Sequence, residues 1–314
     1  YVIVRPNGDP LYTLTNPVDD AMMDINVVLR GEDLLSSTPR QIVLYRYLAE
    51  LGIAGQIPLF GHMPYVMGEG KKKLSKRDPE SNLFLHRDHG FIREGLLNYL
   101  ALLGWSIAAD RDVFSIDEFI EKFDVRDVKA NPAHFDLDKA TAINAEHIRM
   151  LDPQDFLNRS VPYLYRDGVA SAGSWDGLTE RERKILGASA GLVQTRVRLL
   201  GEVPGMMEGL LSAEEYMEPD DDARKQLKDS AGEVLDAAAA ALKGINEADW
   251  HAEKIHDVLG KALVEELGYK PRLAFGPVRI AISGRRVSPP LFESIEILGK
   301  GLTLARLAQL RKHL

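Results

Sequence analysis

Short apolar runs separated by polar turns make up the first seventy residues, and this alternation predicts strands. The predicted strands or extended segments are residues 1–5, 11–15, 26–30, 57–60 and 65–67. The turn Asn7-Gly8-Asp9-Pro10 predicts that the first two form a hairpin. Thr38-Pro39 begins a predicted helix that runs to about residue 51. The predicted apolar face of this helix comprises Ile42, Leu44, Tyr45, Leu48 and Leu51. A strand, a helix and a second strand in this order are typical of a parallel sheet whose loops carry function.

After about residue 80 the apolar positions recur at helical spacing and the strand signal fades. The predicted helices cover residues 92–104, 115–123, 136–150, 179–200, 204–211, 220–243, 247–267 and 290–312. The small residues at 168–177 predict a linker and a candidate domain boundary, and residues 268–286 are predicted to interrupt the last two helices. We therefore predict an α/β part followed by a long all-α region.

Composition places the chain among folded globular proteins. Its 314 residues are enough for about two domains, and 45% apolar with 27% charged residues excludes global disorder. Every apolar stretch is far shorter than the roughly 20 residues that a membrane-spanning helix needs. The absence of cysteine excludes disulfides, thiolate zinc sites, iron–sulfur clusters and cysteine nucleophiles. Because the chain begins at Tyr1 inside a strand-like run, we expect a fragment of a longer protein.

The charge is unevenly distributed along the chain. The net charge of −8 argues against indiscriminate coating of nucleic acid. Residues 269–314 nevertheless hold nine Lys and Arg against two acids, a charge of +7 that leaves −15 on the remainder. A second basic cluster comprises Lys71, Lys72, Lys73, Lys76 and Arg77. Two local basic patches indicate specific anionic partners, although solvated surface charge would explain each patch taken alone.

Three short segments carry residues that suit chemistry. The basic loop at 70–77 follows a predicted strand and can close over phosphates, because lysines act there as mobile point charges. Arg30, Glu32 and Asp33 stand at the carboxyl end of another strand, where open α/β sheets bind ligands. In the predicted strand at 11–15 and just beyond it, Tyr12, Leu14 and Asn16 would share one face.

Together these segments resemble the second half of the catalytic domain of bacterial glutamyl-tRNA synthetases, which are class I aminoacyl-tRNA synthetases. The residues that carry the resemblance are Tyr12, Asn16, Val18-Asp19-Asp20, Arg30-Gly31-Glu32-Asp33, Ser37-Thr38-Pro39, His62-Met63-Pro64 and Lys73-Leu74-Ser75-Lys76-Arg77. The last segment resembles the family's KMSKS-type signature but has Leu74 for Met and Arg77 for the final Ser. The resemblance covers essentially all of the chain, whereas the family's HIGH-type motif does not occur before residue 70.

The resemblance implies three regions and a two-step reaction. Residues 1–80 would be the second half of a Rossmann-type catalytic domain, residues 81–150 a helical stem-contact region, and residues 151–314 an α-helical anticodon-binding domain. The reaction it implies is ATP-dependent formation of glutamyl-adenylate, followed by transfer of the glutamyl group to the 3′ end of tRNA(Glu). We expect ATP to arrive with Mg²⁺, and we expect no zinc site in this chain. The resemblance also implies a cytoplasmic monomer without membrane contact, which binds tRNA(Glu), L-glutamate and ATP.

The same resemblance assigns roles by matching position. Lys73 and Lys76 would be catalytic and would stabilise charge on the phosphates. The ATP site would comprise Asp33, Tyr65, Val66, Met67, Lys73, Ser75 and Lys76. The glutamate site would comprise Tyr12, Asn16 and Arg30, which suits an arginine fork with two oriented hydrogen-bonding partners. The anticodon site would comprise Arg196 for the third base, with Arg279, Ser288, Pro289 and Leu291 for the first two.

Three alternatives remain at this point. A truncated paralogue of the synthetase could glutamylate another acceptor, but such paralogues lack the long C-terminal region. Glutaminyl-tRNA synthetase resembles the catalytic half but ends in β-barrels, whereas this C-terminal region is predicted to be helical. A non-catalytic tRNA-binding protein could use the same scaffold, although the intact segments at 30–33 and 73–77 argue against it.

Overall fold

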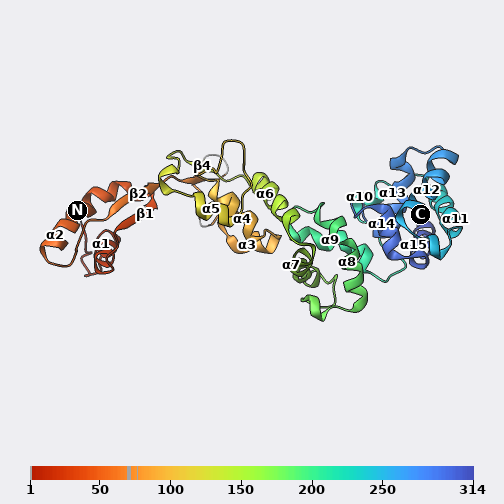
Figure 1. The fold of residues 1–314 in the computed structure, drawn as a ribbon, viewed down its shortest axis with the longest axis horizontal. Helices are drawn as coiled ribbons and strands as arrows, with labels where there is room; N and C mark the ends of the chain where they lie inside the picture. Colours follow the sequence, from red (N-terminus) through yellow and green to blue (C-terminus); the bar gives the residue numbers. More distant parts are fainter. Residues whose placement is uncertain (1, 69–71, 76) are drawn as a thin grey trace. The chain divides into compact units, whose positions relative to one another are not determined.

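The structure is a computed structural model that describes residues 2–68, 72–75 and 77–314. It divides into two compact units (Figure 1). Unit 1 comprises Tyr1–Leu83 and Leu97–Lys139, and unit 2 comprises Phe84–Leu96 and Ala140–Leu314. These limits differ from the predicted boundaries near residues 80 and 150, because residues 84–96 pack with the helices that follow residue 140. Among the described residues, no helix is both long and apolar enough to cross a membrane.

A strand, a helix and a parallel strand form the first part of unit 1, as predicted. The elements are β1 (Val27–Gly31), a 3₁₀ turn (Glu32–Ser37), α2 (Thr38–Glu50) and β2 (Leu59–Met63). The two strands pair in parallel, with Arg30 opposite His62. Their small core contains Ala21, Tyr45, Leu48 and Ala54. The parallel register brings the polar residues at the carboxyl ends of both strands to one edge.

The prediction of a hairpin at residues 1–15 was wrong in its second strand. Residues 12–22 form α1 (Tyr12–Met22), and the pairing before it is a single bridge between Val4 and Pro10. Val18 and Ala21, at helical spacing, pack toward α2 and join its core. The alternation at residues 12–16 therefore matched the period of a strand by chance. The stretch is too short to distinguish a strand period of 2 from a helix period of 3.6.

The remainder of unit 1 contains a second pair of parallel strands. These are β3 (Val66–Met67) and β4 (Ala133–His134). α5 (Ile116–Lys122) begins with the predicted capping box, in which Ser115 and Glu118 bond each other's backbone amides. Trp105 packs edge-on against Phe114, with ring centroids 5.6 Å apart. The predicted helix at 92–104 is α4 (Arg93–Ala101), and that at 136–150 is α6 (Leu137–Met150); by the limits above, each has residues in both units.

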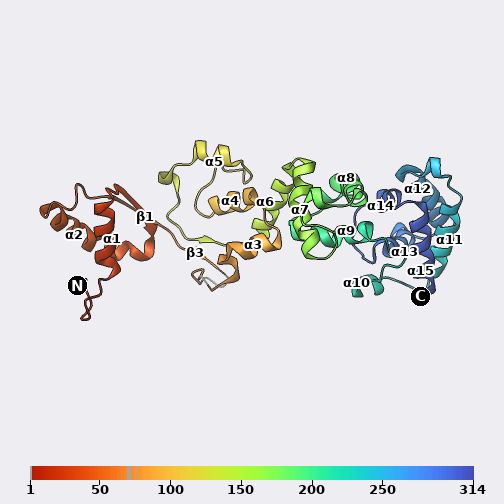
Figure 2. The same ribbon diagram turned by 90° about the horizontal axis from the view of Figure 1, so that it is seen from below.

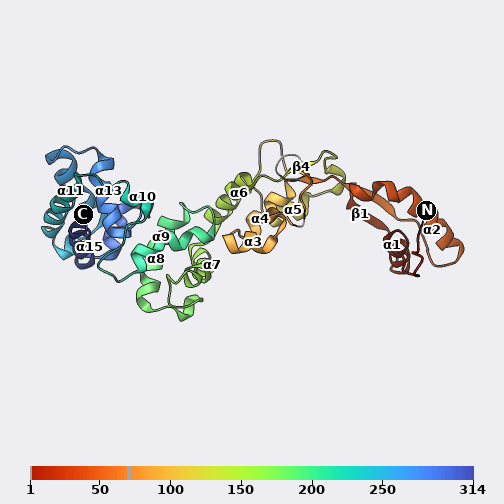
Figure 3. The ribbon, with the colours of Figure 1, turned by 180° about the vertical axis from the view of Figure 1, so that it is seen from behind.

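The first core of unit 2 joins α7 (Pro153–Arg166), α8 (Glu180–Gln194) and α9 (Val203–Leu211), as Figure 3 shows. Its buried side chains include Phe156, Leu164, Leu186 and Met207. α3 (Leu83–His89) is tied to α7 by hydrogen bonds to the carbonyls of Arg87 and Asp88. Gly90 has φ +105° and accepts the amide of Leu200, so the two chain segments approach closely there. The predicted linker at 168–177 is no boundary, because Ala170 is buried in this core.

The second core of unit 2 contains helices from residue 221 onward. They are α10 (Asp221–Arg224), α11 (Ala231–Lys243), α12 (Ala252–Leu259) with a π-helical extension (Gly260–Glu266), α13 (Pro271–Ser283), α14 (Leu291–Leu298) and α15 (Lys300–Lys312). Figure 2 shows α11 and α15 side by side. The buried residues include Ile255, Leu259, Val278, Ile295 and Leu307.

Two predictions for this region were wrong. The predicted interruption at 268–286 contains α13, whose buried residues Ala274, Val278 and Ala281 follow helical spacing despite the internal Pro277. The predicted single helix at 290–312 is divided at Gly299, which has φ +83°. α13 itself ends at Gly284 in the left-handed conformation that favours glycine.

Candidate functional site

Arg30 lies at the end of β1 and is surrounded by neutral hydrogen-bond acceptors. Its Nη1 donates to Oδ1 of Asn16 at 3.2 Å. Its Nη2 donates to Oγ1 of Thr38 at 2.7 Å and to Oε1 of Gln41 at 2.5 Å. The guanidinium also lies over the ring of Phe60, 5.4 Å from its centroid. The structure thus joins two of the three predicted glutamate-binding residues.

A polar network extends from this arginine into unit 1. Nδ2 of Asn16 donates to Asp20 at 2.9 Å, and the hydroxyl of Tyr45 donates to the same carboxylate oxygen at 3.4 Å. Burial, helped by the charge of Asp20 and this hydrogen bond, raises the pKa of Tyr45 to about 12. Tyr45 therefore stays a neutral donor at every physiological pH.

Tyr12, the third predicted glutamate-binding residue, is half exposed. It stands four residues before Asn16 on α1, and residues at this spacing share one face of a helix. Tyr12 and Asn16 therefore face the same way as predicted, but Leu14, two residues from each, does not share that face, because the element is a helix rather than a strand.

The predicted ATP-binding residues Asp33, Tyr65 and Lys73 lie together. Nζ of Lys73 is 3.3 Å from Oδ2 of Asp33 and 4.2 Å from the centroid of the Tyr65 ring. The amide of Tyr65 donates to Oε1 of Glu32 at 3.0 Å. Of the two acids that follow β1, Glu32 thus binds the backbone just before β3, and Asp33 binds Lys73 in the basic loop.

Backbone hydrogen bonds shape the loop that carries these residues. The carbonyl of Val66 accepts the amide of Leu74 at 2.9 Å, and the carbonyl of Met67 accepts that of Phe135 at 2.8 Å. The amide of Ser75 donates to Oδ2 of Asp78 at 2.6 Å. The predicted catalytic residue Lys76 lies outside the described residues.

In unit 2 the structure joins three of the predicted anticodon residues. Nη1 of Arg279 donates to Oγ of Ser288 at 2.7 Å and to the carbonyl of Pro289 at 2.9 Å. Burial, and then the positive charge of Arg196, lowers the pKa of Arg279. The side chain of Leu291 is only 4% exposed and belongs to the second core.

Two neighbouring cavities open along α13. One has a volume of about 470 Å³ and is lined by Arg272, Phe275, Arg279 and Arg286, among others. The second, of about 340 Å³, shares Arg272 and adds two lysines from the α10–α11 connection, Lys225 and Lys228. Guanidinium planes beside an aromatic ring suit the stacking and phosphate contacts of a single-stranded RNA loop.

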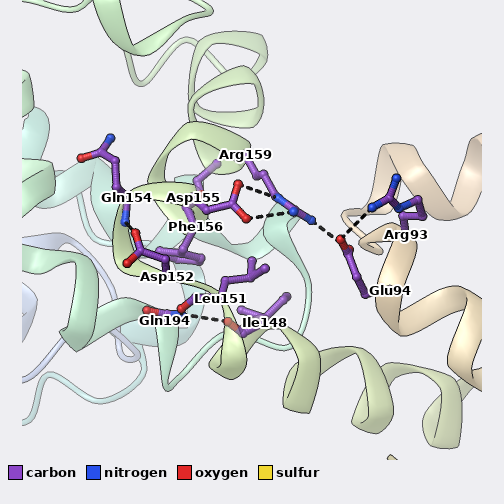
Figure 4. Close-up of polar contacts among 11 residues, drawn as sticks. Arg93, Glu94, Ile148, Leu151, Asp152, Gln154, Asp155, Phe156, Arg159 and Gln194 are labelled. Carbon is purple, nitrogen blue, oxygen red and sulfur yellow. Dashed lines mark hydrogen bonds and ion pairs between the residues drawn. The ribbon is translucent and has the colours of Figure 1, made fainter. Parts of the chain in front are cut away.

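A third cavity, of about 440 Å³, is also lined by arginines but differs in its charge balance. Figure 4 shows the Arg159 guanidinium between two acids, Asp155 and Glu94, each 2.8 Å away. Arg93 pairs with Glu94 as well, at 3.4 Å. Because the protein's own carboxylates neutralise these arginines, this cavity attracts an anion less strongly than the cavities on α13.

Two family models and several curated relatives match the chain. The catalytic-domain model of the class I tRNA synthetases (E and Q) matches residues 1–142, and an anticodon-binding domain model matches residues 155–311. A glutamate–tRNA ligase of Bifidobacterium longum is 79% identical over the whole chain, and one of Kocuria rhizophila is 62% identical. The chain belongs to the class I tRNA synthetases of the glutamate and glutamine group. It spans 62% and 61% of the length of these two relatives.

The fold of this class I synthetase chain is shared by two solved structures. A glutamate tRNA ligase from Elizabethkingia meningosepticum gives a TM-score of 0.77 at 24% identity, covering 100% of this chain and 62% of its own. A glutamate–tRNA synthetase from Elizabethkingia anophelis gives 0.74 at 25% identity, covering 99% and 62%.

Sequence reasoning missed several residues of the Arg30 cluster. The side-chain oxygens of Thr38 and Gln41 both accept hydrogen bonds from Arg30, and the Thr38 hydroxyl also lies 2.9 Å from Nε2 of His62. A signal for them exists, because Thr38, Gln41, Tyr45 and Leu48 are the buried face of α2. Two polar residues on a buried helical face indicate a site. The apolar face predicted from the sequence shared Tyr45 and Leu48 with the buried face but did not include Thr38 or Gln41.

Proposed function

We propose that the protein ligates L-glutamate to tRNA(Glu) in two ATP-dependent steps. The observation that carries this proposal is the Arg30 cluster, a guanidinium surrounded by neutral oxygens, in the same unit as the Lys73–Asp33 pair of the KLSKR loop. An arginine without a carboxylate partner suits an anionic amino acid, and a loop lysine suits a polyphosphate. The two relatives named above are glutamate–tRNA ligases.

In the first proposed step, an oxygen of the glutamate α-carboxylate attacks the α-phosphorus of ATP. A new P–O bond forms, the bond to the β-phosphate oxygen breaks, and pyrophosphate leaves. Lys73, released from Asp33, would stabilise the negative charge on the phosphates together with Lys76. Asp33, Ser75 and the backbone of Tyr65–Met67 would position ATP, since catalysis of this kind rests mainly on placing the reacting atoms.

In the second proposed step, a terminal ribose hydroxyl of tRNA attacks the carbonyl carbon of glutamyl-adenylate, and AMP leaves. Mg²⁺ would enter bound to ATP. Among the described residues no group of three or more His, Asp or Glu side chains could hold a metal ion, so the phosphates would supply most of the ligands. We place the protein in the cytoplasm as a monomer.

We assign the recognition of the anticodon to residues 151–314, and the contacts of the tRNA stems to residues 81–150. Arg196 would bind the third anticodon base, and Arg279 with Ser288 and Pro289 would bind the first two. The arginine-lined cavity beside Arg279 supports this assignment. Because the Leu291 side chain is buried, we retain Leu291 only as the residue that begins α14.

ATP–pyrophosphate exchange by the full-length protein, with and without tRNA, tests the proposed first step. We expect exchange that depends on glutamate. We also expect Arg30→Ala to weaken glutamate binding by about 2–5 kcal/mol while ATP binding is little affected. RNA binding without exchange under either condition would favour a non-catalytic tRNA-binding protein instead. Exchange with glutamate but transfer to a different acceptor would favour the paralogue reading.

A further inference from the structure

Hydrogen bonds to neutral groups hold the guanidinium of Arg30 in place without neutralising its charge. Three of its five N–H groups donate to neutral oxygens, one each from Asn16, Thr38 and Gln41. No carboxylate of the described residues forms an ion pair with it. The nearest acid in the network, Asp20, bonds Asn16 rather than the arginine. The Phe60 ring below the guanidinium attracts it without neutralising it.

Gln41 in this cluster has only one of the two polar atoms of its side-chain amide paired. It is fully buried on α2, its Oε1 accepts from Arg30 at 2.5 Å, and its Nε2 has no hydrogen-bond partner. The reversed amide would aim Nε2 at the N–H groups of Arg30, so the arginine determines the observed orientation. Nε of Arg30 is buried without a partner as well. An unpaired buried donor costs roughly 1–3 kcal/mol, so the amide at this position carries a penalty.

A glutamate at position 41 would have the same shape and would remove the unpaired Nε2. It would also form an ion pair with Arg30 and cancel the positive charge of the site. The neutral amide therefore has one clear physical advantage over the acid of equal size. It orients the guanidinium and leaves its charge available to a bound anion. In a partly desolvated site, the attraction between that charge and the anion is stronger than in water.

We propose that Gln41 is a specificity-determining residue that positions Arg30 for the side-chain carboxylate of glutamate and thereby excludes glutamine. The inference rests on the proposed function. The α-carboxylate of the substrate loses its charge when it bonds to phosphorus, whereas the side-chain carboxylate stays charged throughout. A permanently charged arginine suits the second of these. Glutamine has an uncharged amide in that place and would leave the Arg30 charge without an anion.

The test compares Gln41→Glu with Gln41→Met in the full-length protein. ATP–pyrophosphate exchange is measured with glutamate and with glutamine, alongside the melting temperature. We expect Gln41→Glu to raise KM for glutamate roughly ten- to a hundredfold and to lower the glutamate-to-glutamine preference by a similar factor. The kcat and the KM for ATP should stay within about threefold of the wild type, because the hydrogen bonds of Asp33, Lys73 and Ser75 do not involve Gln41. The melting temperature should stay level or rise.

Gln41→Met is the matched control, because it has the same length but no charge. It should raise KM for glutamate roughly fivefold through lost positioning, and it should keep the preference for glutamate over glutamine. If Gln41→Glu does not fold, an unchanged glutamate KM in Gln41→Met overturns the proposal. If Gln41→Glu reduces exchange with glutamate and with glutamine by the same factor, the proposal is overturned too. Wild-type protein that activates no glutamate overturns the proposed function itself, and that result is visible before any variant is made.

Discussion

Lys73 and Asp33 form an ion pair between residues forty positions apart, with Nζ 3.3 Å from Oδ2. The side chains are 53% and 49% exposed, so the pair contributes little to stability and can open at low cost. The acid after β1 thus holds the lysine of the KLSKR loop next to the Tyr65 ring. Binding of ATP would offer the ammonium a stronger anionic partner.

Lys73→Ala should therefore affect chemistry rather than folding. We expect adenylate formation to slow by roughly two to three decades, the scale of one lost transition-state contact. The melting temperature should stay unchanged. Lys72→Ala is the control, since Lys72 is an exposed neighbour of the same charge. Pyrophosphate exchange measures both, and equal effects of the two substitutions would show that the loop acts only through its overall charge.

Glu182 should make the unfolding free energy depend on pH in the acid range. Burial alone would raise its pKa, but the hydroxyls and amides of Ser171 and Thr179 outweigh burial and lower it from 4.5 to about 2. The stabilisation from this carboxylate is fully present above about pH 4.5 and is lost as the pH falls toward 2.

Glu182→Gln should thus destabilise the protein at neutral pH by on the order of 2 kcal/mol. The difference between variant and wild type should shrink as the pH falls through this window. Glu180→Gln, an exposed acid on the same helix, should show neither effect. Denaturant unfolding at several pH values measures the difference, and a gap that stays constant from pH 7 to 2.5 would refute the assignment.

Arg306 should be a structural residue despite its place in the basic C-terminal segment. It is fully buried and donates to the backbone carbonyls of Gly209, Ser212, Glu214 and Ile282. Burial lowers its pKa to about 10, with a smaller contribution from the charge of Arg181. Arg306→Met should lower the unfolding free energy by about 3 kcal/mol, since it leaves several carbonyls unpaired. Retention of wild-type stability would contradict this role.

Arg279→Ala should weaken discrimination between anticodons by roughly 1–3 kcal/mol, without a comparable loss of stability. The measurement is the KM for tRNA(Glu) transcripts with the native anticodon and with one changed base. Lys312→Ala, which removes an exposed charge at the end of α15, is the control and should change affinity but not preference. A preference that survives Arg279→Ala would place anticodon recognition elsewhere.

The sequence was most informative where function depends on short contiguous segments. Glu32, Asp33, Tyr65 and Lys73 lie together as expected, because strand ends and the loops after them occupy one edge of a parallel pair. The nature of α1 was not predictable from alternation alone, since Tyr12, Leu14 and Asn16 fit the period of a strand although the segment is a helix. Tertiary packing of Val18 and Ala21 against α2 decides that question.

Charge counting overestimated the surface available to RNA. Of the nine basic residues at 269–314, Arg306 is buried, Arg285 pairs with Glu208, and Arg311 pairs with Asp236. The cavity on α13 depends instead on Arg272, Arg279 and Arg286. Which cations fold inward is decided by partners distant in sequence, such as the carbonyls at 209–214, and no local pattern reveals them.

Formation of glutamyl-tRNA by the full-length protein tests the central claim most directly. Labelled glutamate or glutamine is incubated with ATP and a tRNA(Glu) transcript, and the esterified product is quantified. The account predicts an alkali-labile ester with glutamate that requires ATP, falls by roughly two to three decades in Lys76→Ala, and is absent or far weaker with glutamine. A fully folded protein that esterifies no glutamate to this tRNA, or that prefers glutamine, would contradict it.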